Sequence, residues 1–319
     1  MNLKAVFNVV GILLMLLAAI LLVPIAVSLY FQQPAIEGYY SEIGAFSLTL
    51  LVSLVTGFSL WKLLPSGVHA LRDREGFAIV SFSWLSISLF GALPYYLSGV
   101  CPTFIDACFE SMSGFTTTGA TILREIDPLP RGILFWRNLT QWLGGMGIIM
   151  LSLAIFPALG IGSFHLFKAE VPGGPSVERV QPRLAETAKI LWKVYIALTF
   201  VEILLLRFGG MNFFDAICHT FSTVATGGFS PRTASVGSFN NVYFESVIIL
   251  FMFLGGINFA LHYQMIYGDF KKVYQNPELK FYLTMIFLGV TFATFGLWQT
   301  SPETPLPSAF RKASFQVIS

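Results

Sequence analysis

The sequence predicts an all-α, polytopic membrane protein built from repeated units. Hydrophobic residues make up 55% of its 319 residues and charged residues only 11%, less than half the roughly 25% that is usual for soluble domains. The mean hydropathy is +0.71, too high for a disordered chain. The net charge of +2 provides no basic surface for nucleic acid. Composition therefore excludes an ordinary soluble protein, a disordered chain and a basic nucleic-acid binder.

Seven stretches are apolar enough to cross a bilayer, which requires about 20 residues in a helix. The first is too long for a signal-peptide core and lacks a cleavage site, so we expect it to remain as a helix. The third is longer than one span requires and contains Pro94 and Pro102. The stretches are Ala5–Tyr30, Ile43–Trp61, Gly76–Ile105, Asn138–Phe164, Ile190–Leu206, Ser246–Gly268 and Phe281–Thr300.

Lys and Arg are distributed unevenly among the segments that connect these stretches. Twelve of the nineteen lie in segments that share one side of the membrane with the N-terminus. Because Lys and Arg favour the cytoplasmic side, we expect the N-terminus to be cytoplasmic.

Two of the connecting segments repeat each other at an offset of 109 residues. Phe104–Gly119 reads FIDACFESMSGFTTTG, Phe213–Gly228 reads FFDAICHTFSTVATGG, and six of the sixteen positions are identical. The helices that follow share Leu-Gly-Gly at 143–145 and 254–256. Each repeat begins with about eleven helical residues, which cover only about 16 Å and so end inside the bilayer. A polar Thr/Gly strand and a second spanning helix complete the unit.

The polar strand indicates a cation site. Non-helical backbone at membrane depth is tolerated only where it is buried in protein or lines a watery cavity. Backbone carbonyls there can replace a cation's hydration shell, and glycine allows the close backbone approach that this requires. The short helix points its negative C-terminal end toward the cation. We interpret each unit as a helix–pore-loop–helix repeat with a filter strand, at Thr116–Gly119 and Ala225–Gly228.

Three segments, ESMSGFTTTGAT, HTFSTVATGGFSP and RNLTQWLGGMGI, closely resemble the bacterial TrkH-type potassium uptake proteins of the Trk/Ktr/HKT superfamily. The resemblance implies a potassium-channel-like architecture of four such units around one pore, with two extra N-terminal helices. It also implies that glycine at Gly119 and Gly228 goes with potassium over sodium. The filter residues it implies for potassium binding are Thr117, Thr118, Gly119, Thr226, Gly227 and Gly228.

The resemblance also implies a function and partners. We expect the translocating subunit of a potassium uptake system in the bacterial inner membrane, not an enzyme, with potassium as the bound ion and no organic cofactor. The expected partners are membrane lipid, a second copy in a homodimer and a cytosolic nucleotide-binding regulatory subunit of TrkA type, but no nucleic acid. Two alternatives remain open: an ion-coupled secondary transporter, for which inverted repeats would be expected, and a non-conducting fragment if the chain is naturally this short.

The third unit departs from the family pattern. Shifting the first repeat by 206 residues aligns Phe104 with Phe310 and Ser113 with Ser319, the last residue. We therefore expect C-terminal truncation, with the third filter absent. The predicted parts are two N-terminal helices at 1–66, a first repeat at 67–164, a cytoplasmic connector at 165–189, a second repeat at 190–270 and an incomplete third repeat at 271–319.

Two charged residues, Glu110 and Arg137, lie where burial in the membrane is costly. Charges at this depth usually face the bundle and pair, so we expect them to brace the filter from behind. The alternative is that Arg137 extends to the interface. We interpret the glycine pairs at 144–145 and 255–256 as close helix packing rather than a gating hinge.

Overall fold

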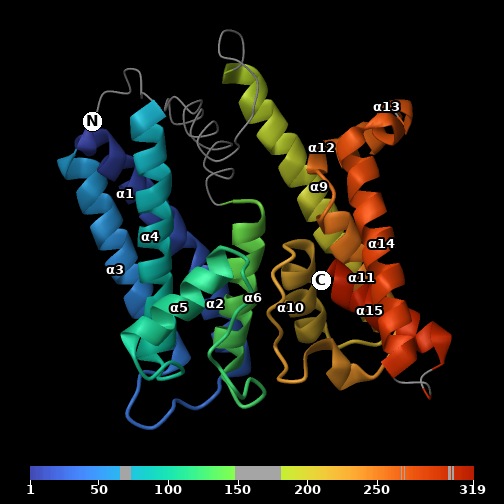
Figure 1. Ribbon diagram of the computed structural model, residues 1–319. Coiled ribbons are helices and arrows are strands. Elements are labelled where there is room, and N and C mark those ends of the chain that lie inside the picture. The colour runs from blue at the N-terminus through green and yellow to red at the C-terminus, as the bar shows by residue number, and fades with distance from the viewer. Residues whose placement is uncertain (65–72, 148–180, 267, 269, 301–302, 304) are drawn as a thin grey trace. The chain divides into compact units, whose positions relative to one another are not determined.

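The computed structural model describes residues 1–64, 73–147, 181–266, 268, 270–300, 303 and 305–319, and every regular element among them is a helix (Figure 1). The chain divides into two compact units, residues 1–189 and 190–319, which are described separately. The predicted all-α class is confirmed for this part of the chain.

The first unit opens with a helical hairpin. Helices α1 (Leu3–Ile20) and α2 (Leu22–Phe31) follow one another and are joined through a connecting segment to α3 (Glu42–Leu63). The sequence predicts one uninterrupted helix over the first stretch, and the structure divides it at Leu21. Pro24 explains the division, because it lies in the first turn of α2 and has no backbone N–H to donate a hydrogen bond to a carbonyl of the preceding turn.

The first helix–pore-loop–helix unit follows the hairpin. A long helix, α4 (Asp73–Leu97), leads into a short helix, α5 (Phe104–Phe115), and the chain then returns through α6 (Arg131–Gly145). Helix α5 packs against both α4 and α6 (Figure 1). The predicted span Asn138–Phe164 is thus described only to residue 147. Of the predicted connector at 165–189, residues 165–180 lie outside the described residues and the rest belong to the helix that begins at Gln181.

The hairpin completes the N-terminal end of α6. Pro130 precedes this helix and has no side chain that can cap it, so the first N–H groups need other acceptors. Gln33 supplies one, because its Oε1 accepts a hydrogen bond from the Arg131 backbone at 2.5 Å. The buried Glu42 carboxylate accepts from Ser28 Oγ at 3.1 Å and lies beside Gly132 in the first turn of α6. The hairpin therefore orients α6.

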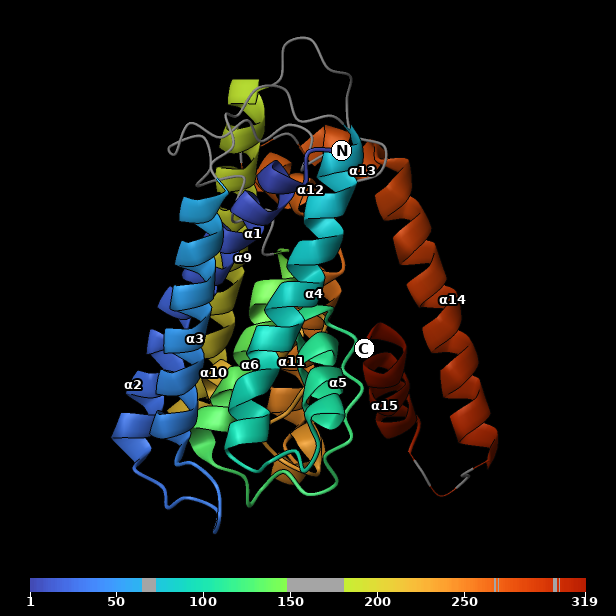
Figure 2. The same cartoon turned by 90° about the vertical axis from the view of Figure 1, so that its left-hand side faces the viewer.

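The second unit begins with the same pattern of a long helix, a 12-residue helix and a returning helix. The predicted span Ser246–Gly268 is interrupted after Gly255, where the chain turns before a separate short helix. A long helix, α14, and a short helix, α15, follow at the C-terminal end. The long helices α9 and α14 run in the same direction (Figures 1 and 2). The elements are α9 (Gln181–Phe208), α10 (Phe213–Val224), the 3-10 helix η3 (Ser235–Phe239), α11 (Val242–Gly255), α12 (Phe259–Ile266), α13 (Phe270–Gln275), α14 (Pro277–Thr300) and α15 (Leu306–Ile318).

Within the described residues, four helical stretches are long and apolar enough to cross a membrane, judged by length and composition alone. They are Leu3–Phe31, Glu42–Leu63, Arg74–Leu97 and Pro277–Thr300.

Candidate functional site

The two short helices begin in the same way. Thr103 Oγ1 accepts a hydrogen bond from the Asp106 backbone at 3.1 Å, and Asn212 Oδ1 accepts one from the Asp215 backbone at 2.9 Å. Each aspartate, identical between the repeats, therefore lies in a first turn, where the helix dipole favours a negative charge. At 12 residues each, α5 and α10 are about 18 Å long.

The two short helices also end in the same way. In α5 the N–H groups of Thr117 and Thr118 donate to the carbonyls of Gly114 and Ser113, both at 3.0 Å. The same two bonds recur 109 residues later at 2.9 and 2.8 Å. This is the hydrogen-bond pattern of a Schellman motif, which requires a left-handed residue directly after the helix cap.

The residues in that left-handed position are threonines. Thr117 has a φ of 54° and Thr226 a φ of 51°, while Gly119 and Gly228 follow at 73° and 83°. A β-branched residue at positive φ is a genuine outlier, costing about 1–3 kcal/mol, and such strain concentrates at functional sites. In both strands φ is positive at the threonine and the glycine but not at the residue between them. The predicted filter strands therefore share one backbone shape.

The first glycine of each Leu-Gly-Gly motif packs against the end of the short helix. A Cβ added at Gly144 would lie 1.9 Å from the Phe115 carbonyl oxygen, and one at Gly255 would lie 2.9 Å from that of Val224. The two contacts are equivalent in the repeats. Small residues that let backbones approach are typical of membrane helix interfaces. The predicted close packing is therefore confirmed for both glycines.

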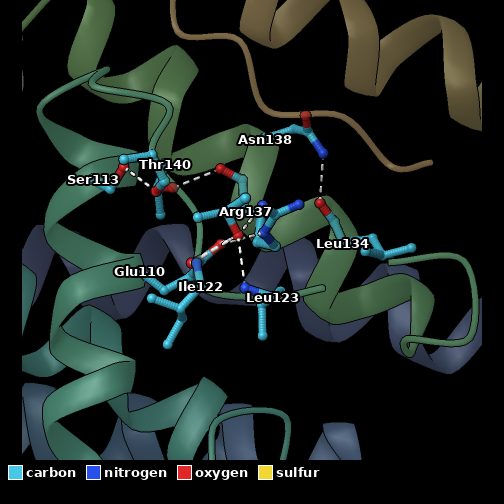
Figure 3. A network of polar contacts seen from close by, with 10 residues as sticks. Glu110, Ser113, Ile122, Leu123, Leu134, Arg137, Asn138 and Thr140 are labelled. Carbon is cyan, nitrogen blue, oxygen red and sulfur yellow. Dashed lines mark hydrogen bonds and ion pairs between the residues drawn. The ribbon is translucent and has the colours of Figure 1, made fainter. Parts of the chain in front are cut away.

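Behind the first strand lies a buried ion pair. Arg137 Nε on α6 donates to Glu110 Oε1 on α5 at 2.7 Å, and neither side chain is exposed to solvent (Figure 3). Glu110 also accepts from Thr121 Oγ1 at 2.9 Å and from the Ile122 backbone at 3.3 Å, while Arg137 Nη2 donates to Thr121 Oγ1 at 3.2 Å. The predicted pairing is confirmed, and Arg137 does not extend to the interface. The pair holds Thr121 and Ile122, which are separated from the last filter residue, Gly119, only by Ala120.

A second contact in this region joins the short helix to the end of the strand. Ser113 Oγ donates to the carbonyl of Ala120, the residue after Gly119, at 2.6 Å. The equivalent hydroxyl, on Ser222, is directed to carbonyls of its own helix instead. The two strands therefore have the same shape but different supports.

The support of the second strand was not predicted from sequence. Arg232 Nε donates to Asp215 Oδ2 at 2.8 Å, and the Arg232 guanidinium lies over the Phe239 ring at 5.1 Å. The residue that corresponds to Arg232 in the first repeat is Leu123, so the repeat itself contains no signal for this pair. The sequence signal for this pair is that two opposite charges, Asp215 and Arg232, lie on either side of the filter strand Ala225–Gly228.

The oxygens of the strands are the candidate ligands for a cation. Among the described residues, no group of three or more His, Cys, Asp or Glu side chains could hold a metal ion. Thr118 and Gly228 are exposed, whereas Gly227 is buried. Carbonyl and hydroxyl oxygens suit a weakly bound, readily exchanged cation. The six predicted filter residues lie on the two strands of common shape, three in each unit.

Comparison with known proteins places these features in a family. Residues 44–298 match the family TrkH, a cation transport protein. The chain is 40% identical to the Trk system potassium uptake protein TrkH of Escherichia coli K12, and the alignment covers 100% of the chain and 65% of the relative. It is 37% identical to TrkG of the same strain, over 93% of the chain and 60% of the relative.

A solved structure is also similar. The crystal structure of the potassium transporter TrkH from Vibrio parahaemolyticus matches with a TM-score of 0.82 and 34% identity, covering 100% of the chain and 64% of the solved chain. The chain thus spans about two thirds of the length of the relatives it matches, 65% for the first of them. The repeated helix–pore-loop–helix architecture expected from the sequence is confirmed by this match.

Proposed function

The chain belongs to the TrkH cation transport protein family, and on that premise we propose that it moves potassium ions across a bacterial inner membrane as the translocating subunit of a Trk-type system. One observation carries the proposal. Two segments 109 residues apart adopt the same backbone, with positive φ at Thr117 and Gly119 and at Thr226 and Gly228. A strained backbone that is built twice indicates a shape that function requires.

The proposed chemistry is replacement of water by protein oxygens. Carbonyl oxygens of Thr117, Thr118 and Gly119 substitute for part of the hydration shell of a potassium ion, as do those of the second strand. Each short helix ends directly before its strand, so that its negative end favours the cation. Alternating the sign of φ turns successive carbonyls toward one side, whereas an ordinary strand alternates their direction. Weak, multiple contacts of this kind bind the ion without trapping it.

The glycines set the discrimination between potassium and sodium in this proposal. A Cβ on Gly228 would meet no atom within 4 Å, so the constraint on that residue is its φ of 83° and not space. Only glycine adopts such a φ without steric cost. A serine at Gly119 or Gly228 strains the strand and alters the spacing of its oxygens.

The direction of the long helices favours a channel-like protein over an ion-coupled transporter with inverted repeats. In the second unit α9 and α14 run the same way, each followed by a short helix (Figure 1). Inverted repeats would instead run in opposite directions. The proposal includes a cytoplasmic N-terminus, a homodimer in the lipid bilayer and a cytosolic regulatory partner of TrkA type.

Growth at limiting potassium tests the proposal. The full-length protein is expressed in a bacterial strain that lacks its own potassium uptake systems, and the wild type is expected to restore growth. Gly119→Ser is expected to reduce uptake of potassium relative to sodium. Gly296→Ser is the matched control, because its Cβ meets no atom within 4 Å and its φ is not left-handed. Absence of rescue by the wild type, or unchanged discrimination in Gly119→Ser, would overturn the assignment.

A further inference from the structure

The segments that follow the two filter strands, after Gly119 and after Gly228, are held by different contacts. In the first repeat, the Glu110 carboxylate accepts from Thr121 Oγ1 and from the Ile122 backbone. The residues 109 positions later than Glu110 and Ile122 are His219 and Pro231. A proline has no backbone N–H, and a neutral imidazole cannot accept two bonds as a carboxylate does. The contacts by which Glu110 holds the segment after the first strand, which we call its anchor, therefore cannot form in the second repeat.

The second repeat places its acid one helical turn earlier. Asp215 precedes His219 by four residues, and its Oδ2 accepts from Arg232 Nε at 2.8 Å and Nη2 at 2.5 Å. The arginine also occupies a different place in the second repeat. Arg232 lies in the segment that follows the filter strand, whereas Arg137 lies on a helix, α6. His219 is buried, and its ring meets the Phe239 ring edge-on at 5.6 Å.

Local structure prepares Asp215 for this role. The side-chain amide of Asn212 donates to Asp215 Oδ2 at 2.6 Å, so the carboxylate is already oriented by the cap of α10. The N-terminal end of the helix favours its negative charge. Asp106 occupies the same position in α5, but the residue equivalent to Arg232 there is Leu123, which has no guanidinium. Among the described residues, an acid–arginine pair thus holds the segment after each filter strand, and the acid lies one helical turn earlier in the second repeat.

The two anchors differ in their exposure to solvent. The Glu110 and Arg137 side chains are 0% exposed, whereas the Arg232 side chain is 35% exposed and that of Asp215 is 3% exposed. Salt screens charges that water reaches much more than it screens buried pairs. Dissolved ions also compete more easily with a partly exposed pair, because the attraction between its two charges is weaker in a high dielectric.

We propose that Arg232, held by Asp215 and Phe239, is a positioning residue for the second filter strand and the point at which dissolved ions act on ion selectivity. The inference rests on the proposed potassium transport and adds a role to a residue outside the filter. Arg232 lies four residues beyond Gly228, so its anchor fixes where the strand ends. The strand keeps its oxygen spacing only while this anchor is closed.

The test measures rubidium uptake and its inhibition by sodium in potassium-uptake-deficient cells that express the full-length protein. Arg232→Gln and Asp215→Asn are each expected to lower discrimination by roughly fivefold, the factor that corresponds to about 1 kcal/mol. The charge-swapped double variant Asp215→Arg, Arg232→Asp is expected to regain part of it. Raising choline chloride is expected to lower discrimination in the wild type but to have no further effect on Arg232→Gln.

Arg124→Gln is the matched control, because Arg124 is an exposed arginine one residue beyond Leu123, in the segment that leaves the first filter. It is expected to behave as the wild type. Arg232→Lys keeps the charge but loses the two-pronged contact, and it is expected to show an intermediate loss even if the glutamine variant does not accumulate. Equal losses in Arg124→Gln and Arg232→Gln, or wild-type selectivity in Arg232→Lys and in Arg232→Gln, would overturn the inference. A wild type that takes up no rubidium would instead overturn the proposed function.

Discussion

Neutralising one member of the buried ion pair is expected to destabilise the first unit strongly. Glu110 and Arg137 are both 0% exposed and 2.7 Å apart, and Glu110→Gln leaves the guanidinium buried without its counter-charge. Breaking such a pair from one side costs about 3–5 kcal/mol. The glutamine can still accept from the Ile122 backbone, so this loss is attributed to the charge and not to the neighbouring hydrogen bonds. Arg137→Gln is expected to have an effect of similar size.

The double variant Glu110→Gln, Arg137→Gln separates the charge pairing from the packing. Because it removes both buried charges, it is expected to recover most of the stability that either single variant loses. The free energy of unfolding is measured by titration with sodium dodecyl sulfate in mixed micelles, and rubidium uptake is measured in parallel. Losses that simply add in the double variant would refute the reasoning, as would a Glu110→Gln protein as stable as the wild type.

Three further outcomes are expected. Gly144→Ala, whose Cβ would lie 1.9 Å from the Phe115 carbonyl oxygen, is expected to lower the unfolding midpoint in the same titration; an unchanged midpoint would contradict the close packing. In Gly119→Ser, strain at a φ of 73° is expected to let sodium inhibit rubidium uptake more strongly than in the wild type, and equal inhibition would contradict this. The Cys101 side chain is 0% exposed, and buried cysteines react poorly because reagents do not reach the thiol. A variant retaining only Cys101 is therefore expected to react with maleimide more slowly than one retaining only the half-buried Cys108, and equal rates at neutral pH would contradict it.

Composition and the internal repeat were sufficient to predict the all-α class and the short helix and filter strand of each unit. Apolar length indicates the spanning helices, and the shared residues from Phe104 and Phe213 onward mark two equivalent short helices. These features are local or repeated, so they are visible without knowledge of packing. The pairing of Glu110 with Arg137 was also predictable, because an isolated charge at membrane depth requires a partner.

Other features depend on tertiary contacts that a repeat cannot reveal. The contact of Glu42 with the first turn of α6 joins residues about 90 positions apart. The anchor made by Asp215 and Arg232 has no counterpart in the first repeat, so an alignment of the two repeats hides it. Sequence symmetry therefore predicts the shape of the filter strands but not how each one is held.

Selectivity in a purified system tests the central claim most directly. The full-length protein is reconstituted into liposomes, and rubidium flux is measured with potassium or sodium as the competing ion, for the wild type and for the double variant Gly119→Ser, Gly228→Ser. The account predicts that potassium competes strongly and sodium weakly in the wild type, and that the two ions compete almost equally in the double variant. Equal competition in the wild type, or a double variant that still distinguishes the two ions, would contradict it.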